Sequence, residues 1–192
     1  MGFDQWKGGP GSARWFAVKL DRRSAPWAFS RGEPFRTIAA LEMFATLLCL
    51  MVFGDAWPAA AHGSLQISGV TDNAGNTSVV SRLMTSKFPL VVILAEVAMQ
   101  LMSRRIDLDL IWAPRNQNEE ADALTNGETF IFDKDLEVKV EVDRLNFLVL
   151  PHLMKKAEDL YEEVKMRRSK GAPKANGAIR KKIPLRQSDP WG

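Results

Sequence analysis

Apolar residues recur at helical spacing in several stretches of the first two thirds of the chain. The clearest stretch is 38–53, in which Leu41, Phe44 and Leu48 share one side and Glu42 lies off it. Thr37 is placed to cap this predicted helix. Three further helices are predicted: a short one that Asn76 or Thr77 caps and that ends at Met84, one over 90–105, and one over 119–126 that ends at Gly127.

Strand alternation appears in shorter stretches between these helices. Residues 65–70 and 107–112 alternate apolar and polar side chains and predict two strands. Residues 13–20 predict another strand, with 26–29 as its hairpin partner, whereas 1–12 are broken by Gly and Pro and predict irregular structure. The order of hairpin, helix, strand, two helices, strand and helix predicts an α/β domain.

The pattern changes after Gly127. Residues 136–142 alternate strictly and predict an edge strand, and residues 147–168 predict a helix. The last residues are rich in Lys, Pro, Gly and Ala without periodicity, which predicts disorder. We therefore divide the chain into an irregular N-terminus (1–12), an α/β domain (13–127), a strand and helix extension (128–168) and a basic tail (169–192).

Charge and composition limit the class of protein. Residues 1–154 hold 15 basic and 18 acidic side chains, a net of −3, whereas residues 155–192 hold 11 and 5, a net of +6. Such a tail either binds nucleic acid or stays solvated, and both readings stay open. The single cysteine cannot form an internal disulfide, which suits an intracellular setting in the nucleus or cytoplasm. The apolar stretch 38–53 is too short to span a bilayer and contains Glu42, so no membrane partner is expected.

Three carboxylates stand where they could meet. Asp72 follows a predicted strand, Asp122 lies in the first turn of a predicted helix, and Glu42 lies within an apolar helix. Carboxylate oxygens are the ligands that magnesium prefers. Each residue also has a structural explanation, since Asp72 can cap a turn and Asp122 suits the helix dipole. Glu42 is the hardest to explain structurally, because an acid in an apolar helix must face water or find a partner.

These residues belong to motifs that resemble a known family. The segment Thr71-Asp72-Asn73, the later segment from Trp112 to Arg115, and the helix start from Asn118 to Leu124 with Asp122 resemble the ribonuclease H domain of retroelement reverse transcriptases. The Leu41-Glu42 pair matches the helical Leu-Glu of that family. The resemblance covers residues 13–127 and implies a ribonuclease H-like mixed sheet flanked by helices.

The resemblance also implies an activity. It predicts two-metal hydrolysis of the RNA strand in an RNA–DNA hybrid, in which one Mg²⁺ or Mn²⁺ readies the attacking water and the other steadies the leaving oxygen. Glu42, Asp72 and Asp122 are then the catalytic and metal-binding residues, and Asn118 fixes the loop. The partner would be an RNA–DNA hybrid or another nucleic acid, and the chain would be part of a longer polyprotein.

The sequence departs from that family at two points. The family carries a further Asp on a first strand at the centre of the sheet, and here only Asp4 precedes the hairpin. The family also often places a His after its last strand, whereas the histidines here are His62 and His152. We therefore expect a sheet without a normal first strand, truncated or degenerate. The alternative function is a non-catalytic remnant that binds nucleic acid or is purely structural.

Overall fold

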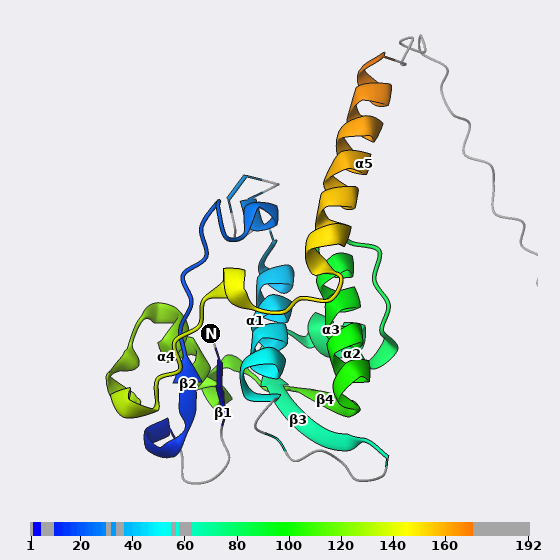
Figure 1. The fold of residues 1–192 in the computed structure, drawn as a ribbon. Coiled ribbons are helices and arrows are strands. Elements are labelled where there is room, and N and C mark those ends of the chain that lie inside the picture. The colour runs from blue at the N-terminus through cyan, green and yellow to red at the C-terminus, as the bar shows by residue number, and fades with distance from the viewer. Residues whose placement is uncertain are drawn as a thin grey trace, which may run out of the picture. The chain divides into compact units, whose positions relative to one another are not determined.

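A computed structural model describes residues 2–4, 10–29, 32–33, 37–54, 57 and 63–170. The chain divides into two compact units, Met1–Ala157 and Glu158–Gly192. The described residues form a mixed α/β structure with five α-helices (Figure 1). In chain order the elements are β1 (Gly2–Asp4), β2 (Arg14–Phe16), α1 (Ile38–Phe53), β3 (Leu65–Thr71), α2 (Ala74–Arg82), α3 (Leu90–Arg104), β4 (Ile106–Trp112), α4 (Glu119–Asn126) and α5 (Leu150–Lys170).

The described strands form two separate pairs. β3 and β4 are parallel, with Leu65 opposite Ile106 and Thr71 opposite Trp112. β1 and β2 are antiparallel and only three residues long. The sequence predicted one mixed sheet, but in the described part of the chain no strand is hydrogen-bonded to both pairs. The α/β class is confirmed, and the expected single sheet is not seen there.

Helix α1 is the centre of the core. It contacts α2, α3 and β1 (Figure 1), and its bounds are those that the apolar pattern predicts. A helix that is apolar almost all round has to be covered on several sides. Phe44 shows this, because its ring packs against Trp27 at 5.3 Å and against Phe147 at 6.2 Å between centroids.

The predicted N-terminal hairpin is wrong. Residues 26–29 form a short 3-10 helix, and β2 covers only Arg14–Phe16 of the predicted 13–20. Its partner is β1, which lies in the stretch expected to be irregular. Pro26 lacks a backbone N–H for a ladder, and Trp27 is buried against the core instead. The Thr37 hydroxyl then donates to the Ala28 carbonyl at 2.9 Å, which joins this turn to the start of α1.

The predicted strand over 136–142 is also wrong, although its alternation is real. Val138, Val140 and Val142 are partly buried against the core, while Lys139 and Glu141 are exposed. Pairing is limited to one bridge between Trp15 and Glu137, with the Val138 N–H donating to the Trp15 carbonyl at 2.8 Å. The segment is therefore extended without a continuous ladder.

Buried Glu96 determines where α5 begins. Its carboxylate is fully buried on α3 and accepts the backbone N–H groups of residues 148–150 at 2.7–2.9 Å. These donors are the free N–H groups around the first turn of a helix, which has no carbonyl partners for them. Helix α5 consequently starts at Leu150 and not at the predicted residue 147. The helix extends to Lys170, two residues beyond its predicted end, so the predicted disorder is wrong for residues 169–170, and the rest of that prediction lies outside the described residues.

Helix ends differ from the prediction around α2. The cap is Asn73, whose side chain accepts the N–H groups of Gly75 and Asn76, so α2 starts earlier than expected. It ends at Arg82, because Leu83 adopts a left-handed conformation with φ 49° and is 55% exposed. Arg105 ends α3 in the same way, at φ 53°.

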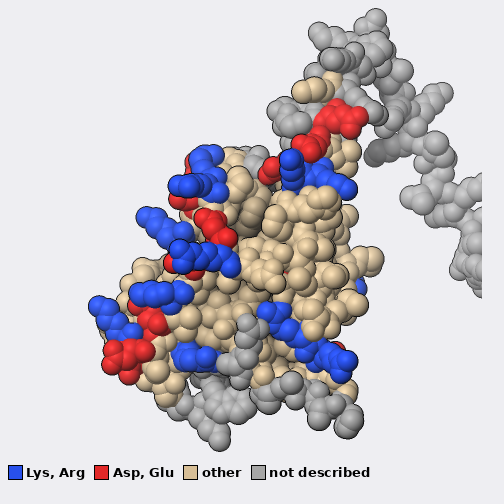
Figure 2. All heavy atoms as spheres, in the orientation of Figure 1, with Lys and Arg blue, Asp and Glu red and all other residues tan. Residues whose placement is uncertain are grey.

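The surface over α2 and α3 carries few charged side chains in the view of Figure 2. Exposed apolar side chains of this region include Met84 at 71% and Met102 at 74%. Such a surface offers few cations to a phosphate backbone. Within the described part of the chain, no helix is both long enough and apolar enough to span a bilayer.

Candidate functional site

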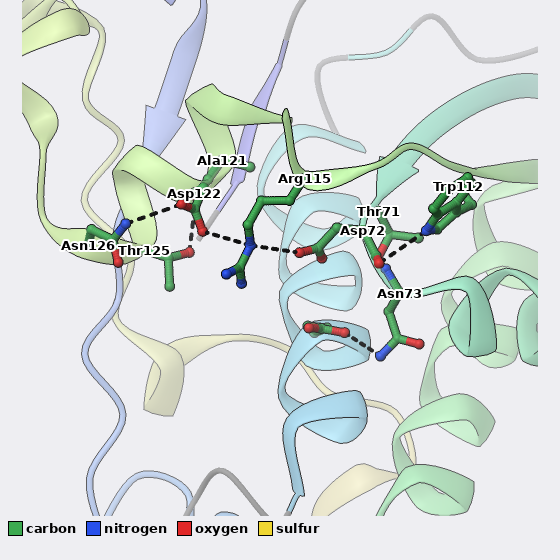
Figure 3. Close-up of polar contacts among 10 residues, drawn as sticks. Thr71, Asp72, Asn73, Trp112, Arg115, Ala121, Asp122, Thr125 and Asn126 are labelled. Atoms are coloured by element: carbon green, nitrogen blue, oxygen red, sulfur yellow. Dashed lines mark hydrogen bonds and ion pairs between the residues drawn. The ribbon is translucent and has the colours of Figure 1, made fainter. Parts of the chain in front are cut away.

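The parallel pairing of β3 and β4 brings two predicted motifs to one edge. Thr71 and Trp112 are register partners at the ends of the two strands. Asp72 comes directly after β3, and the Trp112 indole N–H donates to the Asp72 carbonyl at 3.2 Å (Figure 3). Beyond β4 a short 3-10 turn, Arg115–Gln117, leads into α4, which carries Asp122 in its first turn. The motifs are therefore neighbours in space, as the sequence predicted.

Arg115 lies between the two aspartates (Figure 3). Its Nε is 3.6 Å from Asp72 Oδ2 and 3.4 Å from Asp122 Oδ1. The second oxygen of Asp122 accepts the side-chain N–H of Asn126 at 3.2 Å. Asp72 and Asp122 are only 27% and 34% exposed, whereas Arg115 is 75% exposed. One guanidinium that itself lies largely in water thus offsets only part of the charge of the two carboxylates.

Glu42 reaches the same region from α1. Its Oε2 accepts the Nδ2–H of Asn73 at 2.5 Å. Partial burial raises the pKa of the Glu42 carboxyl above its ordinary value, and the negative charge of Asp72 raises it further. The Asn73 hydrogen bond and the positive charge of Arg115 lower this pKa, but they do not outweigh burial. Glu42 and Asp72 therefore share one electrostatic environment.

Asn73 is a positioning residue that the sequence analysis missed. Its Oδ1 caps α2 by accepting from Gly75 and Asn76, and its Nδ2 holds Glu42. One amide thus fixes the α2 start and the Glu42 carboxylate together. A signal was present in the sequence, because Asn between the end of a strand and the start of a helical stretch is a preferred cap.

A hollow of about 510 Å³ opens beside Arg115 and Asp122. Its lining contains three acidic residues, Glu119, Asp122 and Glu128, and one basic residue, Arg115. An acidic lining repels phosphate and attracts cations. The hollow is therefore better suited to a cation than to a nucleic acid backbone.

The carboxylates do not form a metal centre as they are arranged here. Among the described residues, no group of three or more His, Cys, Asp or Glu side chains could hold a metal ion. Asp72 and Asp122 face the Arg115 guanidinium, and Glu42 is bonded to Asn73. The donor atoms are of the type that Mg²⁺ or Mn²⁺ uses, but their arrangement does not fit either ion.

The remaining candidates contribute less. Asn118 joins the 3-10 turn to α4 through its backbone, since its N–H donates to the Arg115 carbonyl and its carbonyl accepts from Asp122. Asp4 lies on β1 opposite Arg14, and the structure does not describe its side chain. His62 lies outside the described residues, and His152 is exposed on α5.

Comparison of the chain with protein-family models, with curated proteins and with solved structures finds no match.

Proposed function

We propose that this chain is a ribonuclease H-like domain of retroelement origin whose activity is the metal-dependent hydrolysis of the RNA strand in RNA–DNA hybrids. One observation carries the proposal. Glu42, Asp72 and Asp122 come from three separate sequence motifs; Asp72 and Asp122 both lie within 3.6 Å of the Arg115 guanidinium, and the charges of Asp72 and Arg115 both act on Glu42. If each residue had only a local structural role, such as capping a turn or a helix, the three side chains would not need to lie in one region.

The order of elements also supports the proposal. Helix α1 carries Glu42, a parallel pair of strands presents Asp72 at its end, and a later helix carries Asp122. The resembling family arranges three of its acidic residues in this order, after a first-strand Asp that has no match here. This argument uses only the order of the elements along the chain and does not depend on the distances at the site.

The test is cleavage of a hybrid labelled on its RNA strand by the purified full chain, with Mg²⁺ or Mn²⁺ and with chelator. Cleavage is expected with metal only. Asp72→Asn removes one charge without a change of shape, and we expect it to abolish cleavage while circular dichroism stays unchanged. Asp109→Asn is the matched control, because Asp109 is an exposed aspartate on β4 away from these contacts. Equal loss in both variants would contradict the site assignment.

A second candidate function is a non-catalytic module that binds the hybrid or is structural. The position of Arg115 favours it, since a cation of the chain already pairs with both Asp72 and Asp122. The same samples discriminate between the two functions. A folded chain that retains the hybrid in a gel-shift assay but never cuts it would establish the non-catalytic module.

A further inference from the structure

One backbone edge of the extended segment 137–142, part of the yellow stretch that leads to α5 in Figure 1, has no hydrogen-bonded partner within the described part of the chain. The Val138 N–H donates to the Trp15 carbonyl at 2.8 Å, so the backbone groups of residue 138 face β2. In an extended chain the N–H and C=O groups of successive residues face opposite edges. The N–H groups of Lys139 and Glu141 therefore face the second edge, where no described acceptor lies against them. An edge of this kind can pair with another strand.

The charges on the exposed face of this segment select one partner and one register. Lys139 and Glu141 are exposed and carry opposite charges, whereas the valines beside them pack against the core. In an antiparallel pair of two such segments centred on Val140, Lys139 of each copy lies opposite Glu141 of the other. Centring the pair on residue 139 or 141 instead would place Lys opposite Lys or Glu opposite Glu, and like charges directly opposite each other destabilise a ladder.

The segment is therefore complementary to a second copy of itself. We propose that two copies of this chain associate about a two-fold axis at Val140, with residues 139 and 141 of each copy exchanging backbone hydrogen bonds. An interface between identical surfaces needs this self-complementarity, whereas a partner of different sequence does not. The proposal concerns assembly and goes beyond the proposed function, on which it does not depend.

A hollow of about 340 Å³ along this segment offers room for apolar side chains of the second copy. Val52 and Leu145 contribute to its lining together with residues 138–141, and both also pack against the core. The valines of the second copy would lie on the core-facing side of the ladder and enter this hollow, which removes apolar surface from water. Since one short strand forms the ladder, we expect weak pairing, with a dissociation constant above about 10 µM.

The test is sedimentation equilibrium of the full chain over a range of concentrations, in which we expect monomers and dimers. Lys139→Glu or Glu141→Lys alone should weaken dimerisation by about tenfold or more, because each places like charges opposite each other twice in the dimer. Lys87→Glu is the matched control, since Lys87 is exposed in the loop before α3 and lies outside the segment. It makes the same charge reversal and should leave the dissociation constant unchanged.

A mixture of these two variants separates pairing between copies from effects within one copy. In its own chain Lys139 pairs with Glu137 at 2.6 Å, and Glu141 pairs with Arg144 at 2.8 Å. Each variant loses one of these contacts, and mixing cannot restore it. In the mixture, however, the acidic segment of one variant meets the basic segment of the other. We therefore expect mixed dimers with the affinity of the original chain.

Hydrogen exchange of single amides shows which backbone edge is paired. We expect the amides of Lys139 and Glu141 to exchange more slowly as the concentration of the original chain rises. The amide of Val140 faces the other edge, so its exchange should not change. A chain that stays monomeric up to about 1 mM, a mixture of the two variants that forms no dimer, or a dimer without this protection would overturn the proposal.

Discussion

Glu42 is a carboxylate that folding moves partly out of water and next to another negative charge. Both effects raise its pKa above the ordinary value of 4.5. Between pH 4.5 and the raised pKa the folded chain binds more protons than the unfolded chain. The contribution of Glu42 to the free energy of unfolding is therefore fully present below pH 4.5 and is lost as the pH rises through the raised pKa.

Glu42→Gln should remove this pH dependence. At pH 7 the neutral side chain keeps an oxygen for Asn73 and avoids both burial of a charge and repulsion from Asp72. We expect a gain in the free energy of unfolding of less than about 1 kcal/mol, because solvent screens a half-buried group. The gain should disappear below pH 4.5, and urea unfolding at several pH values measures it. Glu141→Gln, which removes one carboxylate charge at an exposed position outside this site, is the matched control.

Buried Glu96 joins the start of α5 to α3. It accepts three backbone N–H groups and the Gln100 side chain, all at 2.6–2.9 Å, and it is fully buried. Glu96→Ala leaves these donors without an acceptor, so we expect a loss of about 3–5 kcal/mol in the free energy of unfolding. Glu158→Ala, on the exposed side of α5, should change it by less than about 0.5 kcal/mol. If urea unfolding showed similar losses in the free energy of unfolding for Glu96→Ala and Glu158→Ala, this role of Glu96 would be wrong.

Leu83 ends α2 in a conformation that favours glycine. Its φ is 49°, where a side chain clashes with the backbone, and 55% of the residue is exposed. We expect Leu83→Gly to raise the free energy of unfolding by about 0.5 kcal/mol. Met84→Gly is the matched control, because Met84 has no positive φ and is more exposed. It should lower stability by about 0.5–1 kcal/mol, and a loss in both variants would contradict the argument.

Elements with strong local signals could be predicted from the sequence, and elements defined by distant partners could not. Helices α1 and α4 have the predicted bounds, because an apolar stretch and a C-terminal glycine suffice to set them. The start of α5 depends on Glu96, which lies 54 residues from Leu150 in the sequence. Strand β2 depends on β1 in the same way. Local alternation showed which side of residues 136–142 is buried but not whether a partner strand exists.

The same distinction applies to the site. The positions of Asp72 and Asp122 follow from the ends of their elements, which the sequence shows directly. The position of Arg115 between them depends on how the turn after β4 folds back toward β3. The sequence motifs identify the acidic residues, but they do not show which positively charged group lies next to them. The charge balance of the site therefore became apparent only from the structure.

Helix α5 contains residues of both compact units. Its first turns belong to the larger unit, where Leu150 and Met154 are 5% and 7% exposed and lie in the core. Leu160 belongs to the second unit and is 61% exposed. One continuous helix thus contains residues that should respond differently to the same substitution.

Met154→Ala and Leu160→Ala test this boundary on a single helix. Met154→Ala removes buried methylene groups and leaves a cavity, so we expect a loss of about 2–4 kcal/mol in the free energy of unfolding. Leu160→Ala removes an exposed side chain and keeps a good helix former, so the change should stay within about 0.5 kcal/mol. Urea unfolding followed by tryptophan fluorescence reports mainly the larger unit, which contains five of the six tryptophans, and Trp191→Phe in both variants removes the signal of the second unit. Equal losses would mean that residues beyond 157 unfold together with the core, since only a cooperative connection would transmit the effect of Leu160→Ala.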